Sequence, residues 1–90
     1  MTETLPPYVD TVDIPTAGTP VVLTSRVLHV RSVALFGASG NVGTVYVVDN
    51  ATTAKKTPIP SGGIVLPIND PRNIQVDADN NGDDVEWIAV

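Results

Sequence analysis

The stretch "DADNNGDDVEW" near the C-terminus has the composition of a calcium-binding loop. A loop of the EF-hand type needs oxygen ligands at its first, third and fifth positions, glycine at the sixth and glutamate at the twelfth. The first half of this pattern is met by Asp77, Asp79, Asn81 and Gly82. The twelfth position, however, is Ile88, and both flanks alternate as strands do, with no helical period. We therefore predict no metal site here, and at most a weak calcium contact between Asp77 and Asp84.

A turn explains the same stretch better. Asn-Gly between two alternating apolar runs is the strongest short-range signal for a β-hairpin. We predict a hairpin at Asn81-Gly82, with the neighbouring aspartates exposed to solvent along its edges.

Catalytic chemistry finds little support in the remaining residues. His29 is the only histidine and there is no cysteine, so a histidine metal site, a thiolate site and a disulfide are all excluded. A serine or threonine nucleophile would need His29 as its base, and no serine has the sequence context of a nucleophile elbow. We expect no catalytic residue, no cofactor and no enzymatic activity.

The sequence also argues against two other kinds of site. The glycines of "GASGNVG" do not have the spacing of a dinucleotide-binding loop, and no helix follows them. The acidic residues cluster in turns, and only Tyr8, Phe36, Tyr46 and Trp87 could build a sugar-stacking surface. We expect the glycine stretch to be a turn and Trp87 to lie in the core.

Length and charge limit the classes of function further. The chain has 90 residues, one domain's worth, and a net charge of −5 with only five cations. Nothing resembles the basic stripe of a nucleic-acid-binding protein. The N-terminus lacks the cationic start and apolar run of a signal peptide, and no apolar run is long enough to cross a bilayer. We expect a soluble protein that binds neither nucleic acid nor membranes.

The pattern along residues 20–90 predicts an all-β fold, a small antiparallel β-sandwich or barrel. Turn signals recur every eight to twelve residues, and helix formers are scarce. The expected strands are Pro20–Ser25, Arg26–Ala38, Thr44–Asn50, Gly63–Asn69, Asn73–Asp79 and Asp84–Val90. Pro67 favours an edge strand or a strand end.

Alternation within these strands predicts which side chains face the core. In the second strand the expected inward residues are Leu28, Val30, Ser32, Ala34 and Phe36. In the last two strands they are Ile74, Val76, Val85, Trp87 and Ala89.

Residues 1–19 differ from the rest and are expected to form an extended, proline-containing N-terminal arm before a domain at 20–90. Prolines restrict this segment to extended conformations, and its apolar residues are sparse. Three interpretations stay open: a frayed tail, an arm that lies along a neighbouring subunit, or an added edge strand of a sheet.

Several phrases of the chain resemble those of small β-rich virion proteins of tailed bacteriophages. The shared phrases are Arg31-Ser32-Val33, Gly40 to Val47, Pro60 to Leu66, Asn73 to Val76, and Gly82-Asp83 leading to Trp87. They lie within residues 26–90 and are patterns of turns and strands. The resemblance implies a protein that decorates capsids or builds head fibres, necks or tail attachments.

These observations together predict a non-enzymatic capsid decoration or cement protein. It would bind the major capsid protein and stabilise the assembled phage head as a homo-oligomer, with a trimer as our expectation. It would be made in the host cytoplasm and reside on the capsid surface of the virion. The expected capsid-contact residues of the arm are Leu5, Pro6, Pro7, Tyr8, Val9, Val12 and Ile14. The expected subunit contacts are Tyr46, Val48, Ile88 and Val90.

Two alternatives remain from the sequence. One is a neck, tail, baseplate or fibre component with the same fold. The other is a module that binds a host glycan or receptor, which would require an exposed cluster of aromatic side chains.

Overall fold

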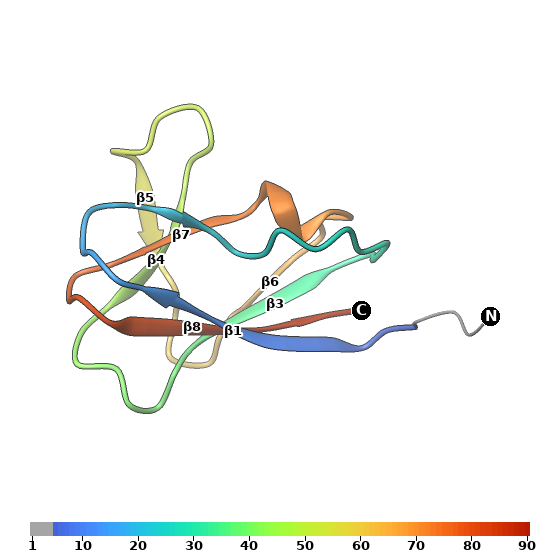
Figure 1. The fold of residues 1–90 in the computed structure, drawn as a ribbon, viewed down its shortest axis with the longest axis horizontal. Coiled ribbons are helices and arrows are strands. Elements are labelled where there is room, and N and C mark those ends of the chain that lie inside the picture. The colour runs from blue at the N-terminus through green and yellow to red at the C-terminus, as the bar shows by residue number, and fades with distance from the viewer. Residues whose placement is uncertain (1–4) are drawn as a thin grey trace.

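Two four-stranded antiparallel sheets make up the structure, a computed structural model that describes residues 5–90 (Figure 1). The first sheet contains, in spatial order, β1 (Tyr8–Ile14), β8 (Asp83–Ala89), β3 (Val33–Gly37) and β6 (Ile64–Leu66). The second contains β2 (Val21–Val22), β7 (Gln75–Ala78), β4 (Val45–Val48) and β5 (Lys56–Pro58). A short 3₁₀ turn, η1 (Pro71–Asn73), precedes β7. The all-β prediction is confirmed. Within residues 5–90 no helix is long and apolar enough to cross a membrane.

The core lies between the two sheets and follows the predicted alternation in the last two strands. In β8 the buried apolar residues are Val85, Trp87 and Ala89. From the second sheet, Ile74 and Val76 are buried against them. Period-two alternation thus identified the inward residues of β8 and the inward positions Ile74 and Val76.

The strands pair mostly with partners far away in the sequence. Among the described strands, β4 and β5 are the only consecutive pair that hydrogen-bond to each other. The hairpin predicted at Asn81-Gly82 is wrong, because β7 lies between β2 and β4 while β8 lies between β1 and β3. With both edges of each strand occupied by other partners, the Asn-Gly turn carries the chain from one sheet to the other. Gly82 takes a φ of +83°, which glycine adopts without strain.

The long second strand predicted at residues 26–38 is interrupted by a β-bulge. The backbone N–H groups of Arg31 and Ser32 both donate to the carbonyl of Val90, at 2.6 and 3.1 Å. Two residues opposite one shift the alternation by one position. Val33 and Leu35 therefore face the core, and the inward positions predicted beyond the bulge, up to Phe36, are wrong.

Residues 8–14, which we expected in an arm outside the domain, form β1 of the first sheet. They pair with β8 over seven residues, from Tyr8 opposite Ala89 to Ile14 opposite Asp83. Tyr8 and Ile14 are buried in the core. Of the three interpretations, the structure shows the added edge strand, in the chain's own sheet. Residues 1–4 of the expected arm lie outside the described residues.

At the other edge of the first sheet, β6 ends before Pro67, as predicted. Gly63, which precedes β6, has a φ of +83° and lies against the ring of Phe36 and the carbonyl of Leu35. A Cβ at this position would overlap the ring, so both the backbone conformation and the space require glycine.

Candidate functional site

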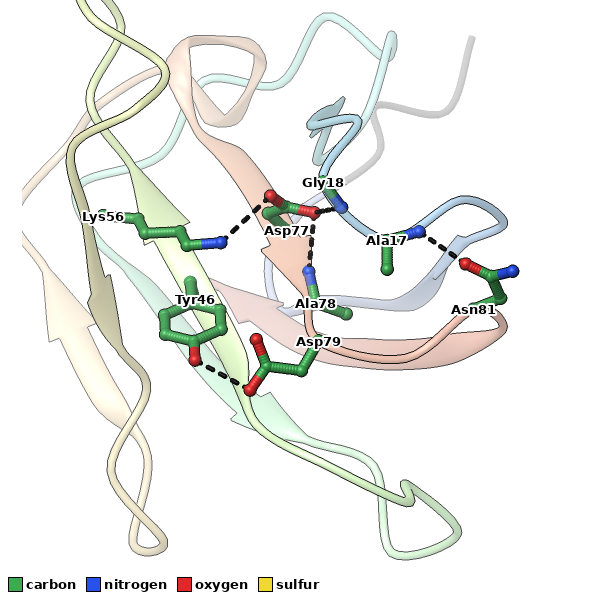
Figure 2. Close-up of polar contacts among 8 residues, drawn as sticks. All are labelled: Ala17, Gly18, Tyr46, Lys56, Asp77, Ala78, Asp79 and Asn81. Atoms are coloured by element: carbon green, nitrogen blue, oxygen red, sulfur yellow. Dashed lines mark hydrogen bonds and ion pairs between the residues drawn. The ribbon is translucent and has the colours of Figure 1, made fainter.

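The acidic stretch that suggested calcium binding organises loops instead. Asp77 is 2% exposed, and its carboxylate accepts hydrogen bonds from the backbone N–H of Gly18 at 3.0 Å and of Ala78 at 2.8 Å (Figure 2). The Lys56 ammonium lies 3.5 Å from the same carboxylate and 4.5 Å from the centroid of the Tyr46 ring. These contacts hold the segment after β1 against β7. The prediction that Asp77 is a solvated edge residue is wrong.

Asp83 holds the loop between β3 and β4 in place through its carboxylate. It is 4% exposed, and its two oxygens accept the backbone N–H groups of Val42 and Gly43, both at 2.9 Å. The amide side chain of Asn41 forms two further hydrogen bonds of 2.8 Å with the backbone N–H and C=O of Asp84. The "SGNVG" turn is therefore fixed to the start of β8 by side chains on both sides.

Two more polar residues of the stretch also have partners inside the molecule. The Tyr46 hydroxyl donates to Asp79 at 2.9 Å, and the side-chain oxygen of Asn81 accepts the backbone N–H of Ala17 at 2.7 Å (Figure 2). The hydrogen bond to Asp79 is the main cause that raises the pKa of the Tyr46 hydroxyl. Asp77, Asp79 and Asp83 thus each bind a different partner within the molecule.

Asp84 lies opposite Asp13 across the β1–β8 ladder. Partial burial raises the pKa of the Asp84 carboxyl, and the hydrogen bond and negative charge of Asp13 raise it further. Two like charges on neighbouring strands destabilise a sheet at neutral pH. Within residues 5–90, no three histidine, aspartate or glutamate side chains come together as metal ligands.

The residues weighed for catalysis and sugar binding are not brought together. His29 is exposed and lies outside any strand. Trp87 and Tyr8 are buried, 1% and 8% exposed. Phe36 and Tyr46, which are half-buried, belong to strands of different sheets. The described residues show no exposed aromatic cluster.

The outer face of the first sheet carries an exposed row of apolar side chains across all four strands. The pairing places Val9 opposite Ile88, Ile88 opposite Ala34, and Ala34 opposite Val65. Val9 is 66% exposed, Val65 64% and Ile88 37%. We call these four residues the apolar row. A contiguous exposed apolar strip of this kind is typical of an interaction surface.

The same outer face becomes acidic towards the other end of β1 and β8. Going along the two strands from the apolar row, the outward positions are Thr11 and Glu86, then Asp13 and Asp84. We call Asp13, Asp84 and Glu86 the acidic end.

Among the strands of residues 5–90, none pairs with the outer edge of β1. The backbone N–H of Thr11 is bonded at 2.8 Å to the carboxylate of Asp10, the preceding residue, so it points away from β8. Because edges alternate along an antiparallel strand, the N–H groups of Val9 and Asp13 point the same way. A seven-residue strand with an open edge is a template for strand addition.

A groove of about 630 Å³ opens on the opposite side, between β5 of one sheet and β6 of the other. Its apolar wall includes Val47, Pro58, Ile64 and Leu66, and Lys55 lies at its border. We call these five residues the lysine groove. The neighbouring loop between β4 and β5 projects from the body of the molecule (Figure 1).

The predicted contact residues have mixed positions. Leu5 and Val9 are exposed, Val12 is half-buried, and Tyr8 and Ile14 belong to the core. Pro6 and Pro7 are exposed and directly precede β1.

The predicted subunit contacts divide in the same way. Ile88 and Val90 lie exposed, and Tyr46 is half-buried against Lys56. Val48 is 5% exposed, so its prediction as a surface contact is wrong.

The sequence alone did not predict most of the apolar row, the open edge of β1 or the lysine groove. The roles of Ala34 and Val65 in the apolar row depend on which strands become neighbours. The strand that carries Asp10 and Thr11 was missed because residues 1–19, with their prolines and sparse apolar residues, were expected to form an arm. The groove beside Lys55 was not foreseen, because it forms between edge strands of different sheets.

No family model, curated protein or solved structure matches this chain.

Proposed function

We propose that this chain is a non-enzymatic virion structural protein of the capsid decoration type. It binds the major capsid protein of the assembled phage head, as a homo-oligomer on the capsid surface. Support comes from the resemblance of residues 26–90 to small phage virion proteins. The observation that carries the proposal is the open edge of β1, a long extended strand at the border of the first sheet.

The binding step is the addition of an extended capsid segment to β1. The incoming strand pairs with the outward backbone groups of Val9, Thr11 and Asp13, and so extends the first sheet. In the free protein Asp10 occupies the Thr11 N–H, which reduces non-specific pairing of the open edge. The capsid segment displaces this carboxylate when it binds.

Decoration of this kind stabilises the lattice through linkage. A ligand that binds only the assembled state adds about 2.7 kcal/mol when its free concentration is 100 times its Kd. No catalysis is required, which fits the absence of any catalytic grouping among the described residues.

Co-sedimentation with purified phage heads tests the proposal, with purified tails in parallel. Thr11→Pro removes an N–H from the open edge and obstructs an incoming strand, while the β1–β8 hydrogen bonds are kept. Thr11→Val is the matched control, because it keeps the backbone N–H. Circular dichroism and urea unfolding establish that both variants fold.

We expect saturable binding to heads by the wild type and by Thr11→Val, and at least tenfold weaker binding by Thr11→Pro. Equal binding by the two variants would move the interface away from β1. Binding to tails and not to heads would favour the neck, tail or baseplate alternative, and a folded chain that binds neither would contradict the proposal.

A further inference from the structure

Two surfaces of this chain are complementary in polarity and charge. The outer face of the first sheet combines the apolar row with the acidic end. The lysine groove combines apolar side chains with the exposed ammonium of Lys55. The apolar parts of the two surfaces can therefore pack together, and their opposite charges can pair.

The outer face supplies no cation of its own. The outward positions along β1, β8, β3 and β6 include no lysine or arginine. Packing two such faces together would bury the carboxylates of the acidic end without a partner. A charge that is buried without a partner loses its hydration, which is strongly unfavourable. A symmetric face-to-face dimer is therefore disfavoured.

The lysine groove, in contrast, has a cation that is available for an ion pair. Lys56 is already placed between Asp77 and the Tyr46 ring. Among residues 5–90 the Lys55 ammonium has no ion pair. The one carboxylate beside the groove, Asp49, accepts the backbone N–H of Thr52 at 2.8 Å. Lys55 is thus the free charge at the border of an apolar groove.

We propose that a second copy of this chain docks its outer sheet face against the lysine groove, so that copies associate head to tail. The apolar row covers the apolar wall of the groove, and Lys55 meets the acidic end of the neighbouring copy. The inference deepens the proposed function, since it names the surfaces of the expected homo-oligomer, but it does not depend on capsid binding.

The position of the two surfaces favours a small closed ring. They adjoin along β6, where Val65 belongs to the outer face while Ile64 and Leu66 line the groove. Adjoining surfaces make each copy turn sharply relative to the one before it. Head-to-tail contacts close into a ring when the rotation permits, and the expected trimer is such a ring.

A charge exchange tests this interface directly. The variants Lys55→Glu and Glu86→Lys each place like charges opposite one another, and the double variant restores an opposite pair in exchanged positions. Thr53→Glu is the control, because it adds a negative charge to the same loop outside the groove lining. The measurement is sedimentation equilibrium of the full chain without capsids, with circular dichroism to establish folding.

We expect the wild type and Thr53→Glu to form an oligomer with the same affinity. Each single variant should raise the dissociation constant at least tenfold, and the double variant should bring it back to within about threefold of the wild type. A chain that stays monomeric at millimolar concentration overturns the inference. So does an oligomer whose affinity is unchanged by either single variant, or single variants whose losses simply add in the double variant. Because the experiment contains no capsid, its failure is distinct from a failure of capsid binding.

Discussion

Asp83 is the residue whose replacement tests the account of the acidic stretch most sharply. Its buried carboxylate is the acceptor for two backbone N–H groups, those of Val42 and Gly43, at 2.9 Å each. Hydrogen bonds to a charged group contribute about 1.5–3 kcal/mol each. Val42 itself is 84% exposed, so water replaces part of what is lost. We therefore take the lower value for each bond.

On this basis, Asp83→Ala lowers the free energy of unfolding by about 3 kcal/mol, and Asp83→Asn, which keeps one acceptor oxygen, by about half as much. Asp49→Ala is the matched control. Asp49 also accepts one backbone N–H, from Thr52 at 2.8 Å, but it is exposed and its loss should cost about 1 kcal/mol or less.

Urea unfolding followed by circular dichroism measures these differences, with a constant slope m as the check that the unfolded state is unchanged. If Asp83→Ala and Asp49→Ala lose the same stability to within about 0.5 kcal/mol, the carboxylate does not hold the loop and the reasoning is refuted.

Three further changes have defined outcomes. Gly63→Ala should destabilise by about 1–3 kcal/mol in thermal unfolding, because of its positive φ and the adjacent ring, whereas Gly62→Ala, with open space around it, should change little. Asp13→Asn should raise stability at pH 7 by roughly 0.2–1 kcal/mol in urea unfolding. Because the pKa of Asp84 is raised, the pair of Asp13 and Asp84 destabilises the folded protein as the pH rises above the ordinary aspartate value of 3.8. An equal gain in stability from Asp13→Asn at about pH 3 would therefore contradict the prediction. Trp87→Ala, at a 1% exposed site, should cost about 3–5 kcal/mol, and a loss below about 1 kcal/mol would mean that the indole is not a core anchor.

The sequence predicted correctly those features that depend only on neighbouring residues of the chain. The alternation of Val85, Trp87 and Ala89 follows from the pleat of one strand, and the proline after β6 ended that strand as expected. Both inferences need only neighbouring residues.

The predictions were wrong where the local structure depends on which strand becomes the neighbour. The bulge at Arg31 and Ser32 exists because both N–H groups meet the same carbonyl of Val90, far along the chain. Asn81-Gly82 has the chemistry of a hairpin turn, but β7 and β8 each already have two other neighbours. Apart from β4 and β5, strands that follow one another in residues 5–90 lie in different sheets. The spacing of strands in the sequence therefore carried little information about which strands pair.

The candidate surfaces depended on the same pairing. Val9 and Val65 are ordinary exposed valines in the sequence, and only the sheet order joins them with Ile88 into one row. Asp77 and Asp83 were expected at solvated edges of a hairpin, because the sequence shows carboxylates but not the backbone N–H groups that reach them from distant loops.

Amide hydrogen exchange of the chain, free and bound to phage heads, tests the central claim most directly. The account predicts that the N–H groups of Val9 and Asp13 exchange readily in the free protein, and that those of Val9, Thr11 and Asp13 become more protected on heads, as a newly added strand requires. Saturable binding to heads that leaves these three amides as exposed as in the free protein would contradict docking through the open edge of β1.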